Sequence, residues 1–385
     1  MARYLKQRFP WREGNQFQLL VDGGEIFPAM LAAIYSAQSQ ILLEMYLVES
    51  GRVADRFIAA LCAAARRGVS VYLLLDDFGA REFDKGDRHR LESAGVQMVF
   101  YNPMHYGELR RNLLRDHRKL LVVDERVALV SGIGLTDDFD TEAHPEDYWH
   151  EAAVRVEGPC AADWVEAFRR NWHSGVGPSE SLPDSTAELE NWAPGRMVGR
   201  VASGRRFGAV EIHRDFVKRV RVAERRVWMM TAYFVPSRRL RRALRLAAAR
   251  GVDVRLLVPG PITDHPGVRY AGRRFYAHLL SAGVRIFEYQ PRFLHAKVLL
   301  CDDWVSLGSS NVDRWNMRWN IEGNQEVEDS GFAGEVRELF ESDFLLCEEC
   351  RLAEWQWRPW YFRLRERLWG YVDTALDWYS RKRAG

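Results

Sequence analysis

The sequence predicts an α/β protein made of two pseudo-symmetric lobes, each with a mainly parallel central sheet. Apolar runs typical of buried strands alternate with longer, apolar-periodic segments typical of helices. Short segments of the first half also return in the second half: residues 63–71 resemble residues 247–254, and Ser-Ala-Gly-Val at 93–96 recurs at 281–284. A chain of 385 residues with 47% hydrophobic side chains can fill two such cores. We therefore expect a duplicated domain rather than a short-repeat solenoid.

The first lobe begins with a regular alternation of strands and helices. The expected strands are Gln18–Val21, Ile41–Leu47 and Val69–Leu75, and the expected helices are Phe27–Ala37 and Val53–Arg67. The second helix stops at Gly68, a residue type that commonly follows a helix end. Because a strand, a helix and a second strand form a right-handed crossover, neighbouring strands should be parallel and covered on both faces.

Composition divides the chain into four segments. Residues 1–175 and 205–345 are the two expected lobes. Residues 176–204 between them are rich in glycine, proline and serine, which is typical of a linker. Residues 346–385 form a last segment rich in tryptophan and arginine. We expect the two lobes to pack against each other and to share one active site at their interface.

One short pattern occurs once in each lobe. Both copies, His117–Asp124 and His295–Asp302, read His-x-Lys, then four mostly apolar residues, then Asp. The apolar residues predict a buried strand, and the two-residue period of a strand puts the histidine and the lysine of each copy on one face. A single His-x-Lys is more often a partly exposed histidine at a strand end. Two copies with identical spacing favour a functional site.

Two imidazoles and two ammonium groups in one pocket suit the chemistry of a phosphodiester. One imidazole can attack phosphorus, the other can protonate the leaving oxygen, and the lysines can neutralise the non-bridging oxygens. This chemistry needs no metal ion and no other cofactor. Cys347 and Cys350 form a solitary C-x-x-C pair without the second pair of a structural zinc site, so we expect no metal there.

The duplicated pattern resembles the HKD motif of the phospholipase D superfamily. Its flanks support the resemblance: Ser-Gly-Ile-Gly at 131–134 and Trp-His-Glu at 149–151 follow the first copy, and Gly-Ser-Ser-Asn at 308–311 and Asn-Ile-Glu at 320–322 follow the second. Within that superfamily the chain is most similar to bacterial cardiolipin synthases of the type that lacks N-terminal membrane helices. The similarity runs from about residue 17 to about residue 329 and so covers most of the sequence.

The resemblance implies roles for the central residues. His117 is the expected nucleophile, which forms a phosphohistidine, and His295 is the expected general acid and then general base. The sequence itself is symmetric in this respect and permits the reverse order. Lys119 and Lys297 are expected to bind the non-bridging oxygens of the phosphate.

Four further residues are expected to support the site. Ser309 and Asn311 would supply neutral hydrogen-bond donors from the second half. Glu151 and Glu322 lie at the family's positions for an acidic residue beyond each motif, and we expect them to orient the histidines through the second ring nitrogen.

The remaining motif residues are Asp124 and Asp302. Each lies seven residues after its histidine, an odd separation that places it on the opposite face of the strand, so a structural role is favoured over a chemical one. The first half also departs from the family pattern, because Gly134 stands where an asparagine is expected. We therefore expect the phosphate to be held asymmetrically.

Composition also bears on partners and compartment. The 55 basic and 53 acidic residues nearly cancel, which disfavours a nucleic-acid partner. Five cysteines, an odd number, do not form a disulfide framework and favour a reducing compartment. The first 13 residues lack the apolar core of a signal peptide, and no apolar run approaches the roughly 18 residues of a spanning helix. We expect a peripheral protein on the cytoplasmic face of the cell membrane.

Two segments are candidates for contact with an anionic membrane surface. The loop at 101–116 carries Arg110, Arg111 and Arg115, which suit lipid phosphates but are equally compatible with a solvated basic loop. After an amphipathic helix expected at Glu335–Leu346, aromatic residues alternate with arginines from Trp355 onward, as in an interfacial anchor. The alternative is a helix that packs its aromatic side chains against the protein body.

The resemblance implies a cardiolipin synthase, which joins two phosphatidylglycerol molecules into cardiolipin and releases glycerol. The motif alone does not choose the acceptor, because water and a glycerol hydroxyl are equivalent to a general base. A phospholipase D hydrolase or a headgroup-exchange enzyme is therefore the alternative, and a nuclease is less favoured. Retention of all four histidines and lysines disfavours a non-catalytic membrane scaffold. The sequence specifies neither the oligomeric state nor the acyl-chain preference.

Overall fold

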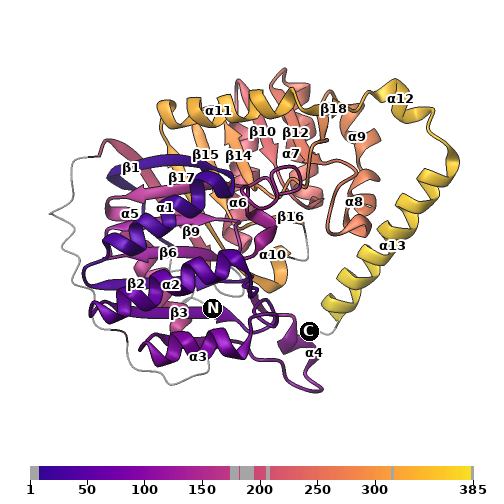
Figure 1. Ribbon diagram of the computed structural model, residues 1–385. Helices are drawn as coiled ribbons and strands as arrows, with labels where there is room; N and C mark the ends of the chain where they lie inside the picture. Colours follow the sequence, from indigo (N-terminus) through magenta and orange to yellow (C-terminus); the bar gives the residue numbers. More distant parts are fainter. Residues whose placement is uncertain (1–7, 174–181, 183–194, 205–208, 314–315, 383–385) are drawn as a thin grey trace.

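The computed structural model describes residues 8–173, 182, 195–204, 209–313 and 316–382 (Figure 1). The strands are β1 (Arg12–Val21), β2 (Gln40–Met45), β3 (Ser70–Asp76), β4 (Gln97–Tyr101), β5 (Arg115–Asp116), β6 (Lys119–Val123), β7 (Val127–Ser131), β8 (Ala152–Glu157), β9 (Met197–Gly204), β10 (Arg226–Met230), β11 (Phe234–Val235), β12 (Asp253–Pro259), β13 (Arg285–Tyr289), β14 (Val298–Cys301), β15 (Trp304–Gly308), β16 (Val312–Asp313), β17 (Asn320–Glu328) and β18 (Cys347–Glu349). The helices are α1 (Asp22–Ser36), α2 (Arg52–Arg66), α3 (Lys85–Ser93), α4 (Leu109–Asn112), α5 (Pro159–Trp172), α6 (Ala209–Val222), α7 (Arg238–Ala249), α8 (Pro266–Arg273), α9 (Tyr276–Leu280), α10 (Asn316–Trp319), α11 (Ser330–Phe344), α12 (Leu352–Gln356) and α13 (Trp360–Lys382), with a 3-10 turn η2 (Asp137–Phe139).

One mixed sheet passes through both halves of the molecule. Its strands lie in the order β18-β13-β12-β10-β14-β15-β17-β9-β1-β8-β7-β6-β2-β3-β4, and β5 pairs with β17. Along this path parallel pairing is confined to the two flanks, β2-β3-β4 and β10-β12-β13, where helices connect the strands. The prediction of an α/β fold with two related halves is confirmed. The prediction that the sheets are mainly parallel is wrong, because the sheet is mixed and its centre is antiparallel.

Tight turns explain two of the antiparallel pairs in the sheet, β6-β7 and β14-β15. The strand that follows each histidine, β6 or β14, returns at once through a neighbour, β7 or β15. Short turns can join only antiparallel strands, whereas parallel strands need a crossover of a dozen or more residues. The sequence pattern predicted β6 and β14 correctly, but it did not predict β7 and β15, whose direction is set by the short turns before them.

The expected elements of the first half are present with shifted ends. Helix α2 begins at Arg52, where the carboxylate of Asp137 accepts hydrogen bonds from the backbone N–H groups of Arg52 (3.1 Å) and Val53 (2.8 Å). This cap comes from a residue 85 positions away from Arg52, so the local sequence gives no sign of it. Helix α11 covers most of the helix expected at Glu335–Leu346.

The second half joins the first through a strand that lies within the expected linker. Residues 197–204 form β9, which pairs with β1 on one side and β17 on the other. The predicted boundary at residue 204 therefore lies too far along the chain, because residues 197–204 belong to the sheet and not to a linker. Residues 176–181 and 183–194 of that segment lie outside the described residues.

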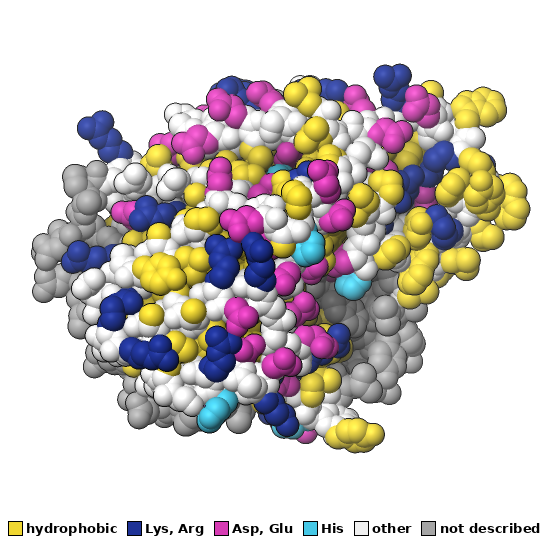
Figure 2. All heavy atoms as spheres, in the orientation of Figure 1, with side chains coloured by type: hydrophobic (Ala, Val, Ile, Leu, Met, Phe, Trp, Pro, Cys, Tyr) yellow, Lys and Arg dark blue, Asp and Glu magenta, His cyan; other side chains and the backbone are white. Residues whose placement is uncertain are grey.

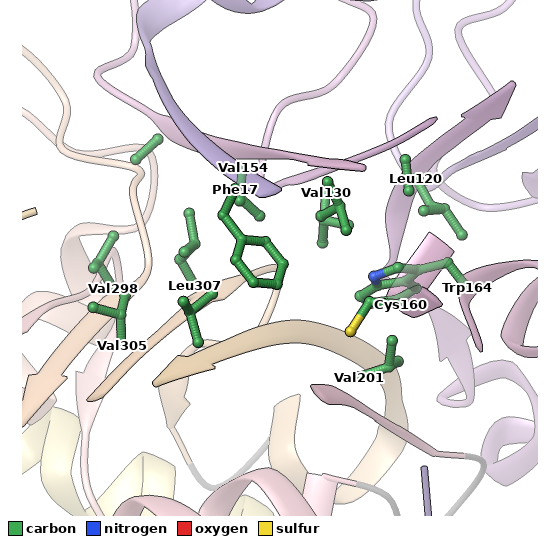
Figure 3. Close-up of a cluster of buried hydrophobic side chains, with 14 of the residues drawn as sticks. Phe17, Leu120, Val130, Val154, Cys160, Trp164, Val201, Val298, Val305 and Leu307 are labelled. Atoms are coloured by element: carbon green, nitrogen blue, oxygen red, sulfur yellow. The ribbon is translucent and has the colours of Figure 1, made fainter. Parts of the chain in front are cut away.

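Side chains from both halves form one hydrophobic core beneath this sheet (Figure 3). Leu120, Val130 and Val154 of the first half share a buried cluster with Val298 and Leu307 of the second half. The two repeats are therefore parts of one packed body, which fixes the two histidine motifs relative to each other.

Helices α12 and α13 leave the sheet, and α13 runs along α8 (Figure 1). Trp355 is buried against the ring of Tyr276, with ring centroids 4.9 Å apart. Trp357 and Trp360, by contrast, are 88% and 69% exposed. One tryptophan of this segment therefore packs in the body and others face outward, so the interfacial anchor stays a prediction. Among the described residues, no helix has the length and apolar character needed to cross a bilayer.

Candidate active site

The backbone of each motif histidine forms a hydrogen bond with the other repeat. The N–H of His117 donates to the carbonyl oxygen of Ile321 (2.9 Å), and the N–H of His295 donates to the carbonyl oxygen of His150 (2.8 Å). Ile321 directly precedes Glu322, and His150 directly precedes Glu151. The two contacts are therefore equivalent under the pseudo-symmetry, and they bring both histidines to the interface between the repeats.

The two buried glutamates also cross between repeats. The Nδ1 atom of His117 lies 3.2 Å from Oε2 of Glu322, and Nδ1 of His295 lies 2.6 Å from Oε2 of Glu151. Each histidine thus has its Nδ1 atom occupied by a carboxylate of the other half. This geometry leaves Nε2 of each ring for a substrate.

Burial favours the uncharged form of each of these acids and bases. It raises the pKa of Glu151 to about 7 and that of Glu322 to about 8. Burial, and then the charges of nearby lysines, hold the pKa values of His117 and His295 well below the usual value. Without substrate the histidines are therefore neutral, which is the form needed for attack on phosphorus.

Lys119 lies beside the first histidine. Its Nζ atom donates to the carbonyl oxygen of His117 (2.8 Å) and lies 5.0 Å from the centroid of the Tyr46 ring. The same tyrosine ring lies 4.7 Å from the imidazole of His117. Burial lowers the pKa of Lys119 to about 7. The sequence motifs do not single out Tyr46, although the residue lies near the end of a strand that the sequence predicts at Ile41–Leu47.

Lys297 shares its surroundings with the second histidine. Its Nζ atom lies 2.8 Å from Nδ1 of His295 and 3.4 Å from Oε2 of Glu151, and burial lowers its pKa. The Nδ1 atom of His295 cannot donate a proton to Glu151 and accept one from Lys297 at the same time. The protonation states of His295, Lys297 and Glu151 are therefore coupled to one another.

Ser309 supports a glutamate and does not face a substrate as a free donor. Its hydroxyl donates to Oε2 of Glu322 (2.5 Å) and accepts from the N–H of Gly323 (3.0 Å). A hydroxyl has one proton to give, so in this arrangement it does not donate to a phosphate, contrary to our expectation. In the first repeat Gly132 lies against Glu151 instead, where an added Cβ would be 2.2 Å from Oε2.

Asn311 lies in the interior and does not line the cavity beside the histidines. It is fully buried, and neither its amide nitrogen nor its amide oxygen has a hydrogen-bond partner among the described residues. An unpaired buried amide is costly unless a ligand satisfies it. At Gly134, the matching position of the first repeat, an added Cβ would lie 2.9 Å from Cβ of Leu47. The packing there leaves little room for the asparagine expected from the family.

The motif aspartates lie at the far end of their strands. The carboxylate of Asp124 accepts hydrogen bonds from the N–H groups of residues 38, 39 and 40, at 2.8–2.9 Å. Asp302 does the same for residues 224, 225 and 226, at 2.9 Å each. Neither aspartate lines the cavity beside the histidines. Each aspartate instead fixes the loop that leads into a neighbouring strand, which is the kind of structural role that the sequence favoured over a catalytic one.

His150 is a residue whose importance we missed. Its imidazole lies between two carboxylates, with Nδ1 2.8 Å from Asp22 and Nε2 3.1 Å from Asp343. Burial alone would lower its pKa, but hydrogen bonds to both aspartates raise the pKa to about 10. Asp22 also accepts from the N–H of Glu151 (2.9 Å). The sequence showed His150 beside Glu151, but its partners are 128 and 193 positions away.

A cavity of about 930 Å³ lies over the two histidines and is lined by both repeats. Arg115 of the basic loop lines it, with Nη1 3.3 Å from Asp76 and Nη2 without a hydrogen-bond partner among the described residues. Arg111 is exposed, and the side chain of Arg110 lies outside the described part of the chain. In the portion of the chain that the structure describes, no three His, Cys, Asp or Glu side chains are grouped to hold a metal ion.

Comparison with known proteins agrees with this geometry. The family model for the "cardiolipin synthase, PLD-like domain" matches residues 30–172 and 216–344, which together exceed half the chain. Cardiolipin synthase B of Salmonella typhi is 36% identical over 381 residues, covering 96% of this chain and 88% of the relative. Cardiolipin synthase A of Pseudomonas aeruginosa strain LESB58 is 35% identical over 340 residues, covering 88% and 68%.

A solved structure shows the same fold. Phosphatidylserine synthase of Haemophilus influenzae superposes with a TM-score of 0.74 at 14% identity, covering 98% of this chain and 96% of that protein. From the family match and the relatives above, the chain belongs to the cardiolipin synthase family, a family of phosphatidyltransferases within the phospholipase D superfamily.

Proposed function

We propose that this protein synthesises cardiolipin by transferring a phosphatidyl group from one phosphatidylglycerol to the free glycerol hydroxyl of a second. The observation that carries the proposal is the pair of histidines at one cavity, each with Nδ1 held by a buried glutamate of the other repeat. The phosphatidylglycerol substrate is also the one that membership of the family implies.

In the first step Nε2 of His117 attacks phosphorus and the bond from phosphorus to the headgroup oxygen breaks. The departing glycerol takes a proton from His295, and the phosphatidyl group remains on His117 as a phosphohistidine. Burial and nearby positive charge lower the pKa of His295 in the empty site. The anionic phosphodiester offsets that charge when it binds, and Glu151 stabilises the protonated ring, so His295 can carry the proton it must give.

In the second step the hydroxyl of the incoming phosphatidylglycerol attacks the phosphohistidine. His295 takes the proton of that hydroxyl, the bond between phosphorus and His117 breaks, and cardiolipin is released. Lys119 and Lys297 stabilise the charge on the non-bridging oxygens in both steps. Glu322 keeps the His117 ring oriented.

We also propose that the protein acts at an anionic membrane surface. Exposed aromatic and aliphatic side chains of α13 suit the headgroup region, and Arg363 and Arg367 on the same helix are exposed and suit lipid phosphates. A location on the cytoplasmic face fits the cysteines, because all five are free thiols.

The test is product analysis. Purified protein is incubated with phosphatidylglycerol vesicles, and lipids and glycerol are identified by mass spectrometry. We expect cardiolipin and glycerol, whereas phosphatidic acid as the main product would indicate the alternative, a phospholipase D hydrolase. His117→Asn and His295→Asn should each lower turnover by at least about a thousandfold, because each removes a group that takes part in both steps. His89→Asn, at an exposed histidine of α3, is the matched control and should leave turnover unchanged.

A further inference from the structure

Contacts made by arginine side chains hold helix α13 against the second repeat. The guanidinium of Arg274 donates to the carbonyl oxygen of Gly370, where an added Cβ would collide with Arg274. The guanidinium of Arg365 lies 3.7 Å from the centroid of the Tyr270 ring on α8. The face of α13 that carries Glu366 and Gly370 is buried. The helix is therefore a docked part of the body, with defined inner and outer faces.

The inner edge of α13 forms a wall of the catalytic cavity. Trp369 packs against α8 at Gly267, where an added Cβ would lie 2.6 Å from the indole ring, so glycine leaves room for this contact. We use the name acyl slot for the apolar part of the cavity that this contact borders. The acyl slot consists of Val235, Val268, Ala271, Trp369 and Val372.

The outer face of α13 carries an exposed apolar stripe. Trp360, Leu364, Leu368 and Tyr371 are 69%, 47%, 56% and 73% exposed, and their spacing of three or four residues places them along one side of the helix. Hydrophobic side chains gather at the right edge of the molecule in Figure 2, where Figure 1 places α12 and α13. Val372 follows Leu368 by one turn, so the stripe continues directly into the acyl slot.

We propose that the acyl slot binds a fatty acyl chain of the phospholipid whose phosphate lies between His117 and His295. The proposal rests on the proposed function, since it assigns a place to one part of that substrate. A phosphate held at the histidines carries its diacylglycerol with it, and the chains need an apolar path from the cavity to the bilayer. The acyl slot and the stripe on α13 together form such a path.

The rest of the cavity is mixed in character. Glu49, Asp138 and Asp264 line a polar part, and Phe78, Met104 and Leu113 of the first repeat line a second apolar part. Thr136 donates to Glu49 (3.0 Å), and burial and the charge of Glu49 raise the pKa of Asp138. Carboxylates disfavour a hydrocarbon chain but accept hydrogen bonds from hydroxyl groups. The polar part therefore suits the glycerol headgroup, and we assign the chain to the acyl slot rather than to the first-repeat side because the acyl slot continues into the exposed stripe on α13.

The first experiment fills the acyl slot. Val268→Trp is compared with the wild-type protein on dioleoyl and dihexanoyl phosphatidylglycerol, both presented in the same detergent micelles so that vesicle binding plays no part. We expect the ratio of long-chain to short-chain turnover to fall at least tenfold. Leu246→Trp adds the same bulk at an exposed position of α7 and should keep the wild-type ratio. A folded Val268→Trp protein with the wild-type ratio would overturn the proposal.

The second experiment needs no variant. Wild-type protein is irradiated with phosphatidylglycerol that carries a diazirine at the end of one chain, and the labelled peptides are identified by mass spectrometry. Labels on α8 and on α13 near Val372 are expected. Labels confined to the first-repeat side of the cavity, at Phe78, Met104 and Leu113, would overturn the acyl slot. If the wild-type protein formed no cardiolipin from either lipid, the proposed function would fail, while the labelling pattern would still decide where the chain binds.

Discussion

At the scale of single residues, the site depends on contacts that cross the pseudo-twofold relation between the repeats. Glu151 holds the histidine of the second motif and Glu322 that of the first, so neither repeat contains a complete histidine and carboxylate pair. The two pairs are not equivalent. Ser309 fixes Glu322, whereas Gly132 leaves Glu151 to be held by Lys297 and by the N–H of the following residue.

His150 is expected to position Glu151 and His295 through its two aspartates. His150→Gln leaves Asp22 and Asp343 without their shared cation, and loss of one partner from a buried ionic group costs about 3–5 kcal/mol. We therefore expect a lower free energy of unfolding at pH 6.5 and a lower kcat with a nearly unchanged KM, because His295 is no longer held in place. Urea unfolding and steady-state kinetics measure these effects, with His89→Gln as the control.

We call His150 together with Asp22 and Asp343 the ionic clamp. The pH dependence of the stability of His150→Gln distinguishes the ionic clamp from simple packing. The folded-state pKa of His150, about 10, lies above its unfolded value of roughly 6.5. Its contribution to stability is therefore fully present below pH 6.5 and is lost as pH rises toward 10. The groups that face it are Asp22, Asp343 and the ring of Tyr289. The stability difference between wild type and His150→Gln should shrink over this range, and a constant difference would contradict the ionic clamp.

At the scale of elements, the sequence predicted what is local and missed what is distant. The two motif strands and helices α1, α2 and α11 follow from apolar periodicity over ten to twenty residues. The cap of α2 by Asp137 and the clamp of His150 join residues at least 85 positions apart. The direction of β7 and β15 depends on turn length, and β9 lies in a segment whose composition resembles a linker. The distant contacts leave no sign in any single segment, whereas the short turns do lie within one segment and the pattern of apolar residues alone does not use them.

Helix α13 gives a prediction at this scale. Replacing Trp360, Leu364 and Leu368 together by serine removes the centre of the exposed stripe but leaves the acyl slot intact. Because apolar area buried at the interface contributes about 25 cal/mol per Å², we expect cosedimentation with phosphatidylglycerol vesicles to weaken at least tenfold. Turnover of dihexanoyl phosphatidylglycerol in micelles should stay close to that of the wild type.

The matched control replaces three exposed apolar residues elsewhere, Val222, Leu246 and Ile262, by serine. This control removes a comparable number of surface hydrophobic groups and should keep wild-type vesicle binding. Equal binding by the two triple variants would show that α13 is not the membrane contact. Added salt should weaken wild-type binding as well, because the arginines of α13 attract anionic headgroups only within a Debye length.

At the scale of the whole molecule, the two repeats form one structural unit. The sheet is continuous from β18 to β4, and the central core takes side chains from both halves. A duplicated domain joined by a linker would permit each half to unfold by itself. Here separation of the halves would expose the shared core and remove the carboxylate partner of each histidine, so stability and activity depend on the same interface.

We therefore expect the protein to unfold in a single cooperative transition. Leu120→Ala in β6 and Leu307→Ala in β15 each remove a fully buried side chain from the shared core, at a cost of about 2–5 kcal/mol. Although they lie in different repeats, both should shift the same urea transition, seen alike by far-UV circular dichroism and tryptophan fluorescence. Leu246→Ala, at an exposed site, should change the unfolding free energy by no more than about 0.5 kcal/mol. Two separate transitions, with each core variant shifting only the one that belongs to its own repeat, would show that the halves are independent domains despite their common sheet.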